Sequence, residues 1–327
     1  MAQSLASIRL PASMRAGGGV IHALEVLDEF DVQSEEDVRA AVLRARKAQP
    51  EWAALKVAER GRILARAIPV MVQRQEELVD VIVRETGKPR PEALAEVLGG
   101  CDALQFYAKR APKFLADRTV PMHLLRTKKL RIAYRPLGVV GIITPWNFPF
   151  MLAFNPTVQA LLAGNAVVLK PSEVTPFSGL LVQEVLRSVR LPDGLFQVVL
   201  GDGGTGAALV ESGVQKICFT GSVRTGRKVG EACGRNLVPF TLELGGKDPM
   251  IVCADADLER AANGAVYGAF SNAGQVCVST ERVYVVDEVA DAFTRKVVEK
   301  TAALRQGSGG EFEIGPMIWP SQLEIVE

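Results

Sequence analysis

The sequence predicts an α/β fold built around a doubly wound, parallel β-sheet. Three observations favour this class: short apolar runs alternate with helical patterns from residue 139 onward, most of these runs are continuously apolar, and polar or glycine-rich turns follow them. Strands that are apolar on both faces are typical of a parallel sheet covered by helices on each side. Such sheets bind ligands at the carboxyl ends of their strands.

The composition limits the possible functions. A chain of 327 residues that is 48% hydrophobic can bury a large core, and we expect two domains. Its 38 Lys and Arg residues nearly balance its 37 Asp and Glu residues, which disfavours nucleic acid and anionic membranes as partners. No apolar run approaches the ~20 residues of a membrane span. The five scattered cysteines indicate a reducing, cytoplasmic location, and no Cys or His spacing indicates a metal site.

The front of the chain is helical. Residues 1–24 contain no acidic residue, and we interpret them as a loose leader rather than a transit peptide. Ser34 and Asp37 suit the start of a helix that continues through Trp52. A second helical pattern runs from about 58 to Gly87, and a third continues to about 109. The polar segment Leu124–Pro136 then predicts a two-stranded arm.

Strands and helices alternate in the remainder of the chain. We predict strands at Val139–Ile143, Ala166–Leu169, Phe196–Leu200, Lys216–Phe219, Pro239–Leu244 and Pro249–Val252. Helical patterns separate most of them, at Phe150–Ala163, Pro176–Val189, Thr205–Ser212 and Thr225–Arg235.

Two loops after strands carry candidate functional side chains. The loop T-P-W-N-F-P-F, residues 144–150, holds Asn147 between two prolines, where its amide is a donor that does not titrate. A helix cap is the alternative role for this residue. The loop K-P-S-E places Lys170 at the ligand edge and Glu173 in the next turn, although a lysine at a strand end is usually a solvated charge.

Two glycine-rich junctions could approach a phosphate. In T-G-S-V-R-T-G, Gly221 and Gly226 flank Ser222 between a strand and a helix, where free backbone N–H groups bind anions. The run Gly201–Gly206 is the other junction. Neither matches G-x-G-x-x-G or a Walker loop, so glycine as a simple turn former is the alternative for each.

Glu243 and Cys277 are the candidate base and nucleophile. Glu243 interrupts an apolar strand, so we expect its carboxylate either to be paired or to have a pKa raised by desolvation, as a general base needs. Cys277 lies in the turn G-Q-V-C, where it is either a packed thiol or a nucleophile. The two histidines, His22 and His123, lie outside the strand-end loops, which disfavours a Cys-His hydrolase. Asn147 and the Cys277 N–H could together hold an oxyanion.

Together these motifs resemble the NAD(P)-dependent aldehyde dehydrogenase superfamily. P-W-N-F-P, K-P-S-E, F-T-G-S-x-x-x-G, L-E-L-G-G-K and G-Q-V-C stand in the family's order, and Glu243 and Cys277 are 34 positions apart (277 − 243). The similarity runs from about Val32 to the end of the chain. It implies an aldehyde-dehydrogenase-like fold: a Rossmann-like cofactor domain at 1–117 and 137–244, a bridging β-arm at 118–136, and the N-terminal part of a catalytic domain at 245–327.

The resemblance also implies a role for each matching residue. Cys277 attacks the aldehyde to give a thiohemiacetal and then a thioester, Asn147 stabilises the oxyanion, and Glu243 activates the hydrolytic water. The aldehyde is the substrate and NAD the expected cofactor, with NADP possible, because Glu173 would repel a 2′-phosphate. Gly246 would keep the backbone close to the cofactor. The remaining cofactor contacts implied are Thr144, Pro145, Trp146, Lys170, Ser172, Glu173, Gly203, Gly206, Phe219, Thr220, Gly221, Ser222, Gly226, Leu244 and Gly245, and Phe148, Leu152, Val276 and Val278 would line the substrate pocket.

One departure from the family leaves alternatives open. The family carries a later E-x-F-G-P motif and a C-terminal strand for forming a homodimer or homotetramer, and neither is found in this sequence. We therefore expect a C-terminally truncated chain that aggregates, binds NAD weakly and shows no aldehyde oxidation. Two functional alternatives remain: an inactive fragment that at most binds nucleotide, and a thiol acyl-transferase or hydrolase that does not use nicotinamide.

Overall fold

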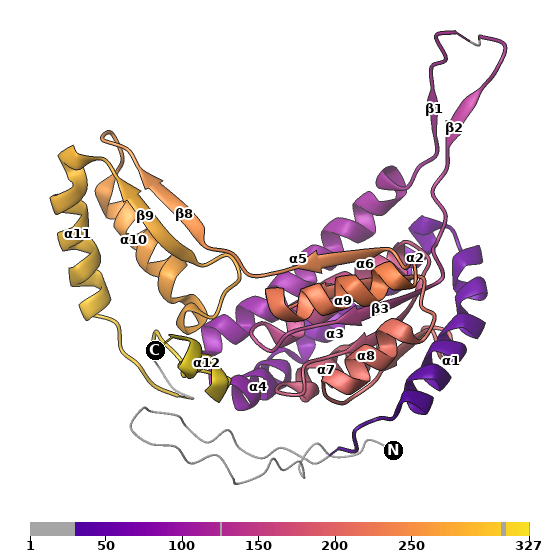
Figure 1. Cartoon of the computed structure of the whole chain (residues 1–327), viewed down its shortest axis with the longest axis horizontal. Helices are drawn as coiled ribbons and strands as arrows, with labels where there is room; N and C mark the ends of the chain where they lie inside the picture. The colour runs from indigo at the N-terminus through magenta and orange to yellow at the C-terminus, as the bar shows by residue number, and fades with distance from the viewer. Residues whose placement is uncertain (1–29, 125, 309–311, 327) are drawn as a thin grey trace.

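The computed structural model describes residues 30–124, 126–308 and 312–326, so the leader interpreted at 1–24 lies outside the described residues. Figure 1 shows three parts: a large body of helices around a sheet, a β-arm that projects from it, and a smaller unit formed by β8, β9, α10 and α11. Within the described residues, no helix combines the length and apolar character that a membrane crossing needs.

The first helices differ from the sequence prediction at one point. α1 (Glu35–Ala54) begins as predicted, since Ser34 and Asp37 form a reciprocal capping box. The pattern expected as one helix to Gly87 is instead α2 (Val57–Leu64), α3 (Ala67–Gln73) and α4 (Gln75–Thr86). Pro69 explains the first break, because proline fits the first turn of a helix but not its interior.

α5 and the arm follow. Gly87 ends α4 with a left-handed φ of 69°, and α5 (Arg90–Phe114) runs past the predicted end near 109. The arm consists of β1 (Arg118–Val120) paired antiparallel with β2 (Leu130–Ile132). Its first strand therefore precedes Leu124, and the prediction that both strands lie within Leu124–Pro136 was wrong.

The main sheet is parallel and has the strand order β5-β4-β3-β6-β7. Its strands are β3 (Val139–Ile143), β4 (Ala166–Lys170), β5 (Phe196–Val198), β6 (Lys216–Thr220) and β7 (Phe240–Glu243). β3 and β4 are buried along their whole length, as continuous apolar runs predict. The chain order reverses between β3 and β6, and such a switch point is where doubly wound sheets bind ligands.

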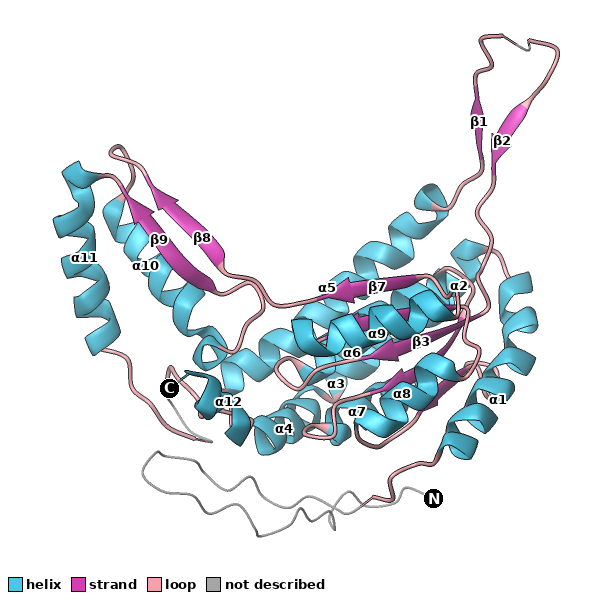
Figure 2. Cartoon of the chain, viewed as in Figure 1, coloured by secondary structure: helices cyan, strands magenta, loops and turns pink. Residues whose placement is uncertain are grey.

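Helices cover both faces of this sheet (Figure 2). α6 (Pro149–Leu162) and α7 (Pro176–Ser188) pack with α2 to α5 in one layer, whereas α1, α8 (Gly203–Glu211) and α9 (Val223–Arg235) form the other. α8 begins earlier than predicted because Asp202 accepts a hydrogen bond from the Gly204 N–H and caps it. One continuous hydrophobic core joins the sheet to both layers. The predicted doubly wound fold is confirmed.

The last part of the chain has its own small core. β8 (Asp248–Val252) pairs in parallel with β9 (Thr280–Val285) rather than with the main sheet. α10 (Leu258–Phe270) and α11 (Asp287–Ala302) pack on this pair around Val252, Ala262 and Phe293. A short α12 (Pro320–Val326) follows.

Candidate functional site

The carboxyl ends of the parallel strands lie along one edge of the main sheet. Ile143, the last residue of β3, pairs with Lys170 in β4 and with Phe219 in β6, while Thr220 pairs with Glu243 in β7. The loops that follow these strands therefore leave the sheet side by side. They carry the predicted cofactor-contacting residues Thr144, Pro145, Trp146, Ser172, Glu173, Gly221, Ser222, Leu244 and Gly245.

The first of these loops is anchored to its neighbour. Thr144 is buried, and its N–H donates to the carbonyl of Lys170 (3.1 Å). Lys170 is itself only 4% exposed, and its ammonium donates to Glu173 across 2.9 Å. Lys170 is therefore buried and paired, and not the solvated charge that a lysine at a strand end usually is. Glu173 keeps almost half of its side chain accessible, so its carboxylate can still meet a ligand.

The glycine-rich junctions open two helices. Gly203 and Gly206 lie in the first turns of α8, and Ser222 caps α9 by accepting from the Thr225 N–H (3.2 Å). A side chain at Gly226 would meet Leu244 within 2.6 Å, so close packing against the β7 side requires this glycine. The N-terminus of α9 thus lies at the same edge as Lys170, and the first N–H groups of a helix have no acceptor within the helix itself.

Glu243 and Cys277 are both exposed in the described structure. Glu243 was expected to be either paired or desolvated, but the structure leaves it exposed, because β7 is an edge strand with no neighbouring strand on one side among the described residues. Cys277 lies close to the segment that follows Glu243: a Cβ placed on Gly246 would lie 3.3 Å from the Cys277 carbonyl oxygen. The two sequence-predicted residues are therefore on neighbouring segments.

Asn147 reaches across to the segment that carries Cys277. Its side-chain N–H donates to the carbonyl of Gln275, two residues before the thiol, at 2.9 Å. Asn272 donates in turn to the carbonyl of Asn147 (2.9 Å) and to that of Gln275 (3.2 Å). The loop after β3 and the loop before β9 are thus held together by side-chain amides.

Sequence reasoning missed a buried ion pair beside Asn147. Lys88 and Glu96 are each 1% exposed and are joined by a 2.6 Å contact. Lys88 also donates to the Asn147 carbonyl (2.8 Å) and lies over the ring of Phe148, 4.6 Å from its centroid. Burial raises the pKa of Glu96, and the neighbouring Lys88 charge counteracts this effect. Glu96 interrupts an apolar helical stripe, and this was the feature of the sequence that could have indicated a buried partner.

The four residues predicted to line a substrate pocket differ in exposure. Phe148, Leu152 and Val276 are half-buried, whereas Val278 is 68% exposed beside Cys277. All four lie on the two loops joined by Asn147 or on the first turn of α6. Their place around the thiol stays a prediction.

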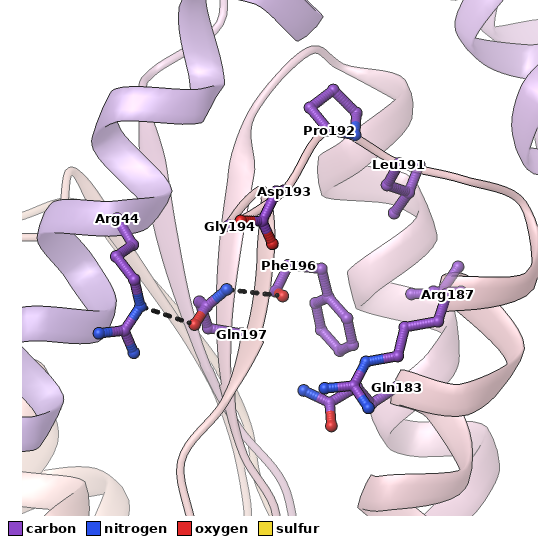
Figure 3. Close-up of a pocket in the computed structure, with 10 residues that line it drawn as sticks. Arg44, Gln183, Arg187, Leu191, Pro192, Asp193, Gly194, Phe196 and Gln197 are labelled. Carbon is purple, nitrogen blue, oxygen red and sulfur yellow. Dashed lines mark hydrogen bonds between the residues drawn. The ribbon is translucent and has the colours of Figure 1, made fainter. Parts of the chain in front are cut away.

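A cavity lies at the opposite edge of the sheet. It measures about 270 Å³ and lies beside the amino end of β5. Arg44 donates a hydrogen bond to Gln197 there, across 3.2 Å (Figure 3). Its lining comes from α1, the second half of α7, the loop before β5 and β5 itself, and none of the candidate residues is part of it. Within the described ranges, no cluster of His, Cys, Asp and Glu could hold a metal ion.

Comparison with known proteins gives consistent matches. A model described as the aldehyde dehydrogenase family matches residues 22–327. The chain is 43% identical over 303 residues to a putative succinate-semialdehyde dehydrogenase [NADP(+)] of Mycolicibacterium smegmatis, covering 92% of this chain and 58% of the relative. It is 41% identical over 305 residues to a 4,4'-diapolycopene aldehyde oxidase of Methylomonas, with the same two coverages.

Solved structures agree with this match. The fold superposes on an NAD-dependent aldehyde dehydrogenase from Sinorhizobium meliloti with a TM-score of 0.88 at 39% identity, covering 93% of this chain and 61% of the other. The chain therefore spans less than two thirds of the length of these relatives. The sequence similarity covers the whole main sheet and the loops that follow its strands. It also covers the segments of Asn147 and Cys277, which the Asn147–Gln275 hydrogen bond joins. The chain belongs to the aldehyde dehydrogenase family.

Proposed function

We propose that this protein oxidises an aldehyde to a carboxylic acid with NAD(P)+, using Cys277 as the nucleophile. The observation that carries the proposal is the hydrogen bond from the Asn147 amide to the Gln275 carbonyl, which brings an amide donor to the loop of an exposed thiol. Relatives named as NADP(+)- and NAD-dependent enzymes support a nicotinamide cofactor.

The proposed chemistry assigns one task to each of three residues. The Cys277 thiolate adds to the carbonyl carbon, and the resulting alkoxide accepts the second N–H of Asn147, whose first N–H is bonded to Gln275. Loss of hydride from this thiohemiacetal leaves a thioester. Glu243 then takes a proton from water, the hydroxide adds to the thioester carbon, and the carbon–sulfur bond breaks to release the acid and the thiolate.

The donors at the sheet edge suit a dinucleotide. Lys170 and Glu173 offer a cation and a carboxylate for ribose hydroxyls, and the N-terminus of α9 offers N–H groups for a pyrophosphate. When bound, the nicotinamide supplies the hydride acceptor. We infer that residues 1–117 and 137–244 hold the cofactor and that 245–327 contribute the thiol.

The location and assembly of the protein are further proposals. All five cysteines lie in the described part of the chain and are free thiols, which supports a reducing, cytoplasmic compartment. The strands of the arm pair only with each other among the described residues, and Leu130 is 44% exposed. Free strand edges favour pairing with another chain, so we propose a homodimer or homotetramer joined through the arm.

The test combines NADH formation with thiol trapping. A purified form of the protein that spans the full length of the relatives is mixed with NAD+ and a panel of aldehydes, and NADH absorbance and the mass of the Cys277 peptide are followed. We expect NADH formation and a trapped thioester that the Cys277→Ala variant lacks. A hydrolase or acyl-transferase would form an acyl-enzyme from an ester without NAD+, and a nucleotide-binding fragment would bind NAD+ without forming a thioester; either result contradicts the proposal.

A further inference from the structure

Helix α5 carries two carboxylates on one face, of which Glu96 is buried and Glu92 is half-buried. Glu92 and Glu96 are separated by one helical turn, and the neighbouring residues Ala93 and Val97 are buried in the main core. The two side chains therefore project in the same direction from an otherwise apolar stripe. Each of them contacts a different loop of the proposed active site.

Glu96 holds the loop that carries Asn147. One carboxylate oxygen accepts from Lys88 (2.6 Å), and the other accepts from the N–H groups of Phe150 and Met151, each at 3.1 Å. Because Lys88 also binds the Asn147 carbonyl, the ion pair contacts this loop both at Asn147 and at the start of α6. A carboxylate at the N-terminus of α6 is also favoured by the helix dipole.

Glu92 holds the loop that carries Cys277. One of its oxygens accepts from the N–H of Asn272 at 2.7 Å. Asn272 and Ala273 both adopt left-handed backbone angles, with φ of 51° and 55°. This conformation costs a non-glycine residue about 1–2 kcal/mol, so the loop keeps its shape only because its contacts hold it.

Gln275, two residues before Cys277, links the loop that carries Asn147 to the loop that carries the thiol. Gln275 is 7% exposed; its backbone carbonyl accepts from Asn147, and its side-chain oxygen accepts from the Ile318 N–H at 2.8 Å. Its side-chain nitrogen donates to the Asn272 carbonyl at 2.8 Å. The position of Cys277 thus depends on a set of bonds that begins at Asn272 and Glu92.

We propose that Glu92 and Glu96 are positioning residues, which set the distance between the Asn147 amide and the Cys277 thiol from two adjacent turns of α5. The catalytic meaning of this proposal rests on the function proposed above. The second oxygen of Glu92 is buried and has no hydrogen-bond donor among the described residues. Such an oxygen destabilises the fold, so stability alone does not account for a carboxylate at this position.

The decisive variants are Glu92→Leu and Glu92→Gln. Leucine removes the acceptor but keeps an apolar volume on α5, whereas glutamine retains an acceptor for the Asn272 N–H. Two readouts need no turnover: amide hydrogen exchange of peptides covering 271–279 and 145–152, and iodoacetamide alkylation of Cys277, with exposed Cys253 as the internal reference.

Glu92→Leu is expected to speed exchange in 271–279 at least about tenfold, the effect of losing one hydrogen bond to a charged group. The Cys277 alkylation rate should change at least about threefold relative to Cys253, and Glu92→Gln should restore both values to within about twofold. Glu96→Gln should instead loosen 145–152 and leave 271–279 protected. Val42→Ala, a buried substitution in α1, is the control for a general loss of stability and should change neither loop.

Activity provides a separate comparison. Where wild-type protein forms NADH, Glu92→Leu and Glu96→Gln should lower kcat by about tenfold or more, with KM for NAD+ changed less than about twofold, because misplacement affects the reaction and not cofactor binding. Absence of NADH from a wild-type protein that spans the full length of the relatives overturns the proposed function but leaves the exchange and alkylation results decisive. Glu92→Leu with wild-type exchange in 271–279, or equal effects of Glu92→Leu and Glu92→Gln, overturns the positioning role.

Discussion

Glu85 in α4 accepts three hydrogen bonds from the start of α7, two of them from the N–H and the hydroxyl of Ser178, at 2.9 and 2.5 Å. The third comes from the N–H of Phe177 at 2.6 Å. This carboxyl is fully buried, and desolvation raises its pKa from 4.5 to about 7 in spite of these donors. One side chain thus both caps a helix and responds to pH near neutrality.

The first prediction concerns stability against pH. Because the folded-state pKa of Glu85 lies above the unfolded value, the folded protein binds the proton more tightly. Its contribution is complete below about pH 4.5 and is lost as the pH rises through about 7. Chemical denaturation at pH 5 and pH 8 should show the unfolding free energy of wild type, relative to that of Glu85→Gln, falling by about 2–3 kcal/mol. A difference that is independent of pH contradicts the assignment; comparing with Glu85→Gln cancels the contributions of other carboxyls.

The second prediction concerns the buried ion pair. Lys88→Met keeps a similar volume but leaves the Glu96 carboxylate without its cation, so it should lower the free energy of unfolding by about 3–5 kcal/mol. The double variant Lys88→Met/Glu96→Gln removes the buried charge as well and should be less destabilised than Lys88→Met. Urea denaturation of four proteins provides the test: wild type, Lys88→Met, Glu96→Gln and the double variant. If the double variant shows the sum of the two single losses, the pair is not coupled.

The third prediction concerns cofactor choice. In a form that spans the full length of the relatives, we expect NAD+ to bind about tenfold more tightly than NADP+, because the half-exposed Glu173 carboxylate repels a 2′-phosphate. Glu173→Gln should narrow this gap, whereas Glu211→Gln, an exposed change at the end of α8, should leave it unchanged. Dissociation constants from cofactor titration measure both. Equal affinity of the wild-type protein for the two cofactors would falsify the prediction.

The fourth prediction separates the thiol from the carboxylate. In a form that spans the full length of the relatives, Cys277→Ala should abolish both the initial NADH burst and turnover, because no covalent adduct forms. Glu243→Gln should retain the burst but slow the later steady state by about 100-fold, since water is no longer activated. Stopped-flow absorbance with thioester trapping distinguishes the two steps. Normal steady-state turnover of Glu243→Gln at neutral pH would show that this exposed carboxylate is not the base.

The sequence predicted the sheet better than the surroundings of the site. Continuous apolar runs such as Val139–Ile143 have one stable environment, between two helical layers, so the strands and their common edge could be read from the pattern. Glu243 was misjudged because an apolar strand pattern does not reveal that its strand lies at the sheet edge.

The hydrogen bonds around Asn147 could not be predicted. Glu92, Asn272 and Gln275 meet only after distant segments pack, and no local period or motif encodes which carbonyl an amide reaches. Glu96 carried a weak signal, since a carboxylate on an apolar helical stripe must find a partner. The break between α2 and α3 was readable from Pro69 in retrospect.

The bond between Asn272 and Glu92 spans 180 positions of the chain, and that between Gln275 and Ile318 spans 43. All five strands of the main sheet are present once Glu243 has been synthesised. During translation, which releases the N-terminal parts first, the edge proposed to bind the nucleotide can therefore assemble while the loop of Cys277 still lacks its last partner. Cys277 can reach its described position only after Ile318 leaves the ribosome, so the proposed cofactor site can form in a nascent chain before the proposed nucleophile is in place.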